Sequence, residues 1–106
     1  MSKEEFKKQK YIKLFIDYIN QKNYSVHTLD SYINDLYYFY EFVNIDLINA
    51  TESDIRNYLE ELNKSKEKSS SVRRKISTFK SFYKFLYTNN YMDKKDYPLT
   101  RIVYPK

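Results

Sequence analysis

Residues 69–88, SSSVRRKISTFKSFYKFLYT, decide the fold of this chain. Placed on a helix at about 100° per residue, the apolar side chains gather on one face, as in a helix that packs on a core. That face consists of Val72, Ile76, Phe79, Tyr83 and Leu86, with Phe82 at its edge. Beside it runs a second line, which we call the basic row, at the spacing i, i+4, i+7 and i+11; its members are Arg73, Ser77, Lys80 and Lys84.

The basic row has no acidic partner in its own helix. Residues 69–88 contain five Lys or Arg residues and no Asp or Glu. Exposed helix faces usually mix both signs, because opposite charges at the spacing i,i+4 attract each other. We therefore interpret the row, together with Arg74 next to it, as a surface at which phosphate supplies the missing negative charge. A solubilising face with no partner is the alternative.

The positive charge of the whole chain is concentrated in the same region. The formal net charge is +5, and residues 69–106 carry nine basic and two acidic side chains, against ten basic and twelve acidic ones in residues 1–68. A local excess of this kind steers an anionic partner toward the surface that carries it.

Composition predicts one all-α domain that spans residues 1–106. The chain has 106 residues, no Gly, only two Pro, and 20 aromatic residues (13 Tyr and 7 Phe), which together favour helices around a ring-rich core.

With one His and no Cys, neither a zinc site nor a Cys–His pair can form, and glycine loops for phosphate are excluded. We expect no active site, no metal, no cofactor and no small-molecule substrate. No apolar run approaches the ~18 residues of a membrane span, so we expect a soluble cytoplasmic protein that does not bind membranes.

Four helices and a tail follow from the periodicity. We expect helices over residues 2–22, 25–44, 51–65 and 69–88, with N-caps at Ser25, at Thr51 in a capping box with Asp54, and at one of Ser69, Ser70 and Ser71. Residues 91–106 contain both prolines, so we expect either an extended strap over the bundle or a linker whose continuation is absent.

Polar side chains form a matching line on the second helix. His27, Ser31, Asn34 and Tyr38 repeat at the same register as the basic row, opposite the apolar face of their helix. Hydroxyl and amide groups of this kind suit contacts with phosphate and sugar, while Arg and Asn can also read base edges in the major groove. The two lines together predict a DNA-binding surface. An exposed residue without a role is the alternative for His27.

The first helix carries a second apolar side. Tyr11, Leu14 and Tyr18 lie apart from its main buried face. Such a helix is either sandwiched within the domain or docks another protein. The second case supports an alternative function, a helical module for protein–protein interaction.

The order of these blocks resembles the N-terminal core-binding domain of the tyrosine recombinases, the Xer-type and phage-integrase family. FIDYINQKNYSVHTLDSYINDLYYFYEFV is similar to the family's opening through Ser25, Thr28, Tyr32, Asp35, Leu36 and Phe39. A middle element is matched by Ala50, Thr51, Asp54, Ile55, Tyr58 and Leu59. The last helix is matched by Ser71, Val72, Arg74, Ile76, Ser77, Lys80, Phe82, Tyr83 and Phe85, and the end by Pro98 and Pro105. Lys80 departs from the commoner Arg, so it keeps the charge of that position but not the planar fork.

The resemblance implies a four-helix, SAM-like orthogonal bundle with an extended C-terminal tail. It implies a domain that forms half of a clamp around duplex DNA at a recombination half-site, with its second and fourth helices facing the DNA. The family's catalytic residues belong to a C-terminal domain that this chain lacks, so the chain itself is not expected to be an enzyme, although its parent is. Other recombinase protomers are the implied protein partners, and the first helix would help them meet.

The candidate residues are therefore of three kinds. For DNA we name Thr28, Ser31, Asn34, Ser71, Arg73, Arg74, Ser77, Lys80 and Lys84, to which His27 and Tyr38 are added from the same polar line. For contact with protein we name Tyr11, Leu14 and Tyr18. We name none for catalysis or for a metal.

Overall fold

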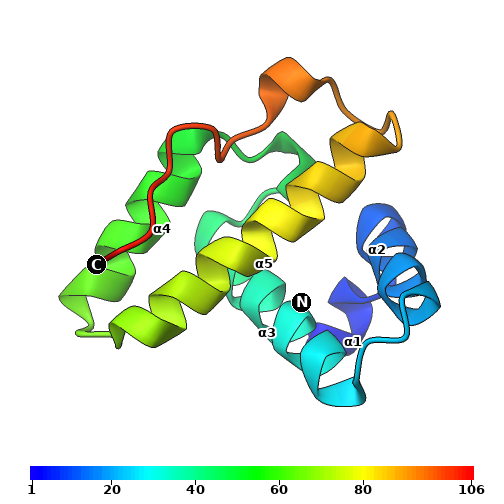
Figure 1. Ribbon diagram of the computed structural model, residues 1–106, viewed down its shortest axis with the longest axis horizontal. Helices are drawn as coiled ribbons and strands as arrows, with labels where there is room; N and C mark the ends of the chain where they lie inside the picture. The colour runs from blue at the N-terminus through cyan, green and yellow to red at the C-terminus, as the bar shows by residue number, and fades with distance from the viewer.

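The computed structural model describes all residues 1–106 and contains helices and no strand (Figure 1). The all-α prediction is confirmed. The helices are α1 (Lys3–Phe6), α2 (Lys10–Gln21), α3 (Val26–Val43), α4 (Glu52–Lys64) and α5 (Ser69–Thr88), with short 3-10 turns η1 (Leu47–Asn49) and η2 (Lys94–Asp96). None of these helices combines the length and the apolar character that crossing a bilayer requires.

The long helix α5 organises the bundle. In Figure 1 it crosses in front of α3, with α2 on one side and α4 on the other, and the C-terminal tail runs alongside α4. Aromatic rings fill the space between the helices: Phe79 of α5 lies 4.9 Å from Phe39 of α3, and Phe82 lies 5.3 Å from Phe15 of α2, measured between ring centroids. The buried hydroxyl of Tyr83 donates a hydrogen bond of 2.6 Å to the carbonyl of Leu47, which fastens η1 to α5.

The first predicted helix is divided in two. The chain leaves the helix after Phe6, and Gln9 has an extended backbone (φ −61°, ψ 144°) before α2 begins. Phe6 is fully buried between the rings of Tyr37 and Tyr40 on α3, at 5.5 and 5.2 Å. A continuous helix could not place Phe6 there and also turn the apolar face of α2 toward α5, so the break at residues 7–9 reorients the chain.

Left-handed backbone ends several segments without any glycine. Asn23, Asn44 and Asn90 have φ values of 58°, 56° and 62°, and Lys66 has a φ of 59°. Asn tolerates this region better than most residues, because its short side chain bonds locally to the backbone. Asparagine thus takes the place of glycine at three of these four turns.

Two of the three predicted N-caps are confirmed. The Ser25 hydroxyl accepts from the Thr28 amide at 3.1 Å, and Thr51 forms a reciprocal capping box with Asp54. The prediction that one of Ser69, Ser70 and Ser71 caps the last helix is wrong. All three already have helical backbone, and the residue that precedes the first turn is Lys68, whose side chain makes no capping bond.

Three buried apolar residues, Pro98, Leu99 and Ile102, hold the C-terminal tail to the bundle. Leu99 and Ile102 are 1% and 4% exposed, as the predicted strap requires, whereas Val103 is 81% exposed and does not anchor the tail. Beyond Ile102 the tail therefore has little apolar contact to hold it in place.

The capping box at the start of α4 predicts a measurable loss of stability when it is removed. Thr51→Ala should lower the free energy of unfolding by about 1 kcal/mol in urea denaturation, because the amide of Asp54 loses its acceptor. Ser53→Ala is the control, since Ser53 is exposed in the same turn and caps nothing. Equal effects of the two substitutions would contradict the role of the cap.

Candidate nucleic-acid interface

A buried carboxylate joins the two helices that carry the predicted polar lines. Asp35 of α3 is 1% exposed. Its Oδ1 accepts from Nη2 of Arg74 at 2.8 Å and lies 3.5 Å from Nζ of Lys75. Its Oδ2 accepts from Nε of Arg74 at 3.2 Å and from the hydroxyl of Thr78 at 2.9 Å. Every donor in this cluster, which we call the Asp35 junction, comes from α5.

The junction corrects one part of the interpretation of the last helix. The negative charge that seemed to be missing beside Arg74 and Lys75 is supplied by Asp35, from a neighbouring helix. The hydrogen bonds to Asp35 raise the pKa of Arg74 above its ordinary value. The Arg74 side chain is still 49% exposed, and its Nη1 makes no hydrogen bond, so one edge of the guanidinium faces solvent.

The basic row lies on the outer side of α5, as predicted, but its members differ in what they contact. Arg73 and Lys84 are exposed and take part in no ion pair. In the middle of the row the Ser77 hydroxyl bonds to the Tyr104 hydroxyl at 3.1 Å, and Nζ of Lys80 lies 4.3 Å from the centre of the Tyr104 ring. The two ends of the row are therefore free, and its middle is covered by the tail.

Two residues of α3 flank the junction. Ser31 and Tyr38 lie one helical turn before and after Asp35, so they share the side of α3 that meets α5. Tyr38 is exposed and Ser31 is half-buried. These two side chains of the polar line therefore lie one turn from Asp35, the residue that binds Arg74.

The other candidate residues on and around α3 are placed less favourably for contact with DNA. The Thr28 hydroxyl bonds to Ser25 at 3.0 Å as part of the helix cap, and the Asn34 side chain accepts from Lys3, which turns it toward α1. His27 is exposed in the first turn of α3, and Ser71 is half-buried in the first turn of α5.

A groove that the sequence did not reveal adjoins the free end of the basic row. It has a volume of about 350 Å³ and lies between the end of α2, the loop before α3 and the end of α5. Its lining includes Lys84, Ser81, Tyr18 and Tyr24, and it contains no carboxylate. Lys22 stands over the ring of Tyr18 at 4.9 Å, which adds a cation beside the groove. In the sequence, only the i,i+4 spacing of Tyr18 and Lys22 indicated any part of this groove.

The apolar patch on the first helix packs against its own chain. The Tyr11 ring lies 5.6 Å from that of Tyr91, and the Tyr18 ring lies 4.8 Å from that of Phe85. Leu14 is also partly buried against the core. This arrangement corresponds to the first of the two alternatives, a helix that is sandwiched within the domain.

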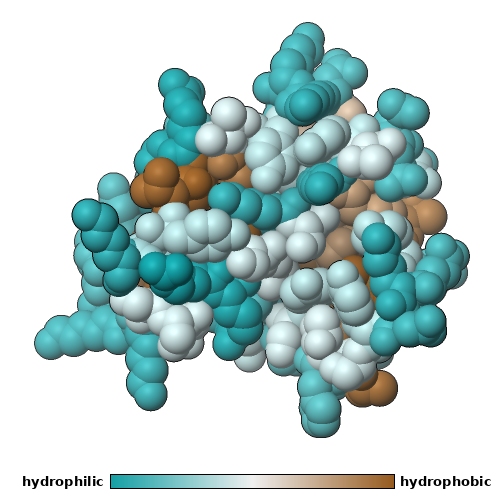
Figure 2. Space-filling model, in the orientation of Figure 1, coloured by the Kyte–Doolittle hydropathy of each residue, from teal (hydrophilic) through white to brown (hydrophobic).

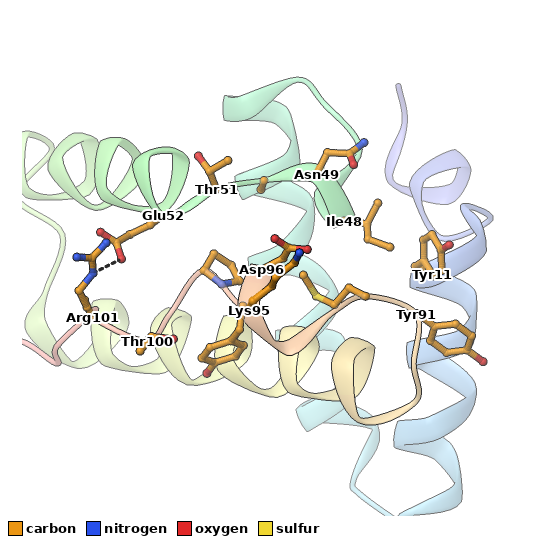
Figure 3. Close-up of a pocket in the computed structure, with 14 residues that line it drawn as sticks. Tyr11, Ile48, Asn49, Thr51, Glu52, Tyr91, Lys95, Asp96, Thr100 and Arg101 are labelled. Carbon is orange, nitrogen blue, oxygen red and sulfur yellow. Dashed lines mark hydrogen bonds and ion pairs between the residues drawn. The ribbon is translucent and has the colours of Figure 1, made fainter.

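The largest hollow lies away from the basic row, between the start of α4 and the tail (Figure 3). It measures about 890 Å³, with Tyr11 and Tyr91 at one end and Glu52 at the other. Arg56 and Arg101 each bond to Glu52 at 3.1 Å, and the bond from Arg56 is the main cause that lowers the pKa of this carboxyl. A carboxylate held by two guanidinium groups is poorly suited to proton transfer. No group of three or more His, Asp or Glu residues is arranged to hold a metal ion.

The outer side of α5 is largely polar. Figure 2, in the orientation of Figure 1, shows hydrophilic and intermediate residues across the face where α5 lies in front, with apolar residues in separate small patches. This surface has no extended apolar area of the kind that obligate protein interfaces bury.

Comparison with protein families matches residues 12–90 to the family described as phage integrase, N-terminal SAM-like domain. The chain is 35% identical to the tyrosine recombinase XerC of Anoxybacillus flavithermus, over 86% of the chain and 32% of that protein. It is 38% identical to XerC of Listeria innocua (89% and 32%) and 39% identical to XerC of Staphylococcus haemolyticus (81% and 29%). The chain thus spans about a third of the length of these curated relatives. No solved structure matches it.

The Asp35 junction predicts a large effect of a small substitution. Asp35→Asn should lower the free energy of unfolding by about 3 kcal/mol, because the largely buried ammonium of Lys75 then has no counter-charge. Urea denaturation monitored by circular dichroism measures the change. Asp30→Asn, on an exposed position of the same helix, is the control and should change stability little. A loss for Asp35→Asn as small as that of the control would show that the junction does not hold α3 and α5 together.

Proposed function

The chain belongs to the phage integrase N-terminal SAM-like domain family, and from that premise we propose that it is the DNA-binding N-terminal domain of a site-specific tyrosine recombinase. In this proposal it holds duplex DNA at a recombination half-site. The observation that carries the proposal is the Asp35 junction, which joins α3 to α5 and leaves the Arg74 side chain 49% exposed next to the basic row.

Charge supports a nucleic acid as the partner. Arg73 and Lys84 have no acidic partner, and the junction sets two cations, Arg74 and Lys75, against one carboxylate. With Lys80, four side chains of α5 are available to neutralise phosphates: Arg73, Arg74, Lys80 and Lys84. Release of the corresponding counterions would make log affinity fall against log salt with a slope of roughly −4.

Shape is consistent with this partner. An α-helix with its side chains is about 10–12 Å wide, which matches the roughly 12 Å width of the major groove of B-DNA. Hydroxyl groups such as those of Ser31 and Tyr38 can bond to phosphate oxygens at the edge of such a contact and position the protein on the duplex.

At positions 74 and 80 the contacts favour positioning of the protein on the DNA over reading of its bases. Arg74 uses Nε and Nη2 on Asp35, and a Lys stands at position 80, so neither side chain presents a free planar fork to a guanine. We infer that the isolated domain binds duplexes weakly, with a dissociation constant of about 1 μM or higher at physiological salt.

The catalytic step is assigned to another part of a longer protein. None of the 13 Tyr residues is proposed as the nucleophile. Tyr83, for example, is fully buried, donates to Leu47, and has a pKa that burial raises far above its ordinary value. We propose that the parent protein is a recombinase that acts in the cytoplasm, with other protomers as its protein partners.

The protein-interaction module is the weaker of the two functions. The patch that it would use, Tyr11, Leu14 and Tyr18, is partly buried against the core of its own chain. We therefore do not propose it as the main role of this domain.

Substitution of the two free ends of the basic row tests the proposed DNA binding. The double variant Arg73→Gln/Lys84→Gln should weaken binding to a duplex of about 20 base pairs and change the salt slope from about −4 to about −2, because two phosphate contacts are lost. Fluorescence anisotropy at several salt concentrations measures both quantities. The control, Lys8→Gln/Lys13→Gln, removes the same charge from exposed positions of the N-terminal segment. A slope near zero for the parent chain, or equal losses for the two double variants, would overturn the proposal.

A further inference from the structure

The tail contact on the basic row conflicts with the use of that row for DNA. The Tyr104 ring occupies one side of the Lys80 ammonium at 4.3 Å, and its hydroxyl bonds to Ser77 at 3.1 Å. Phosphate oxygens would approach the same two groups. A phosphate and the aromatic ring cannot both lie against the same side of one ammonium.

The Tyr104 side chain borders a hollow between the tail and the bundle. A cavity of about 270 Å³ lies between the tail and the helices α4 and α5, lined by Leu59, Val72 and Ile76 on the helix side and by Val103 and Tyr104 on the tail side. The last deeply buried anchor of the tail is Ile102, and Tyr104 itself is 39% exposed. The polar and charged contacts that hold Tyr104 are its two contacts with the basic row.

We propose that Tyr104 is a displaceable cover on the middle of the basic row, which competes with the DNA backbone for Lys80 and Ser77. The inference rests on the proposed function, since it concerns the regulation of the same surface. In the closed state Arg73 and Lys84 are available to phosphate and Lys80 is withheld. When Tyr104 leaves, Lys80 and Ser77 join the contact.

The cover is weak enough to be opened by DNA. An exposed cation–π contact changes an equilibrium by about two- to fivefold, and the hydroxyl bond to Ser77 adds a factor of similar size. A chain whose tail swings about Ile102 can therefore exchange this contact for a phosphate without unfolding any helix.

Removal of the ring tests the proposal. Tyr104→Ala should tighten binding of a 20-base-pair duplex about fivefold, because DNA no longer has to displace the ring from Lys80 and Ser77. Tyr104→Phe keeps the ring and should give a smaller gain. Val103→Ala is the matched control, because Val103 is adjacent and 81% exposed and makes no contact with the row.

A double-mutant cycle shows whether Lys80 is the residue that is released. In a Lys80→Gln background, Tyr104→Ala should lose most of its gain. Unchanged binding by Tyr104→Ala would overturn the cover while leaving DNA binding intact. Weaker binding would overturn it as well, because Tyr104 would then be a DNA contact itself. Absence of binding by every variant would overturn the proposed function and the cover with it.

A second measurement needs no DNA. The ε-methylene protons of Lys80 should be shifted upfield by the Tyr104 ring in NMR spectra, and Tyr104→Ala should return them to ordinary values. Ordinary Lys80 shifts in the unsubstituted chain would contradict the closed state directly.

Discussion

The structure depends on one buried carboxylate and the groups that donate to it. Asp35 has almost no exposed surface, and an unpaired carboxylate in that position would cost far more free energy than the domain could spare. It is tolerated because Arg74, Lys75 and Thr78 all donate to it from α5. Since these bonds are directional, they fix how α5 crosses α3, which apolar contacts between the same helices would do less specifically.

This constraint explains why the two outer surfaces belong together. Ser31 and Tyr38 lie one turn from Asp35 on α3, while Arg73 is the neighbour of Arg74 on α5. Rotation of either helix would break the junction, so the junction fixes which sides of α3 and α5 meet. The carboxylate lowers the local charge without abolishing it, because two cations surround one anion.

Much of the fold could be predicted from local sequence, and the reasons are physical. The apolar spacing of residues 69–88, the caps at Ser25 and Thr51, and the left-handed turn at Asn23 all arise within a few residues. The break at residues 7–9 could not be read in the same way, because Phe6 is placed by rings on α3, about thirty residues away. The N-cap of α5 was predicted wrongly because three serines in a row could each cap a helix. The sequence alone therefore does not show at which residue the first turn begins.

The candidate site was predictable in outline and not in its contacts. Periodicity identified the basic row, but the partners of its neighbours lie far along the chain: Asp35 is 39 residues from Arg74, and Tyr104 is 27 residues from Ser77. The first had no clear signal, since Asp35 lies one turn from Ser31 and Tyr38, on the side of its helix that the periodicity assigns to polar residues. The cover by Tyr104 had no signal either.

The most direct measurement is a titration of the 15N-labelled domain with a short duplex, followed by amide NMR shifts. If the junction presents α3 and α5 as one surface, shifts should concentrate on both helices, at Ser31 and Tyr38 and at Arg73 and Lys84, while Glu60 on the exposed side of α4 stays unchanged. Shifts confined to one of the two helices, or centred on α4, would contradict a shared surface for DNA.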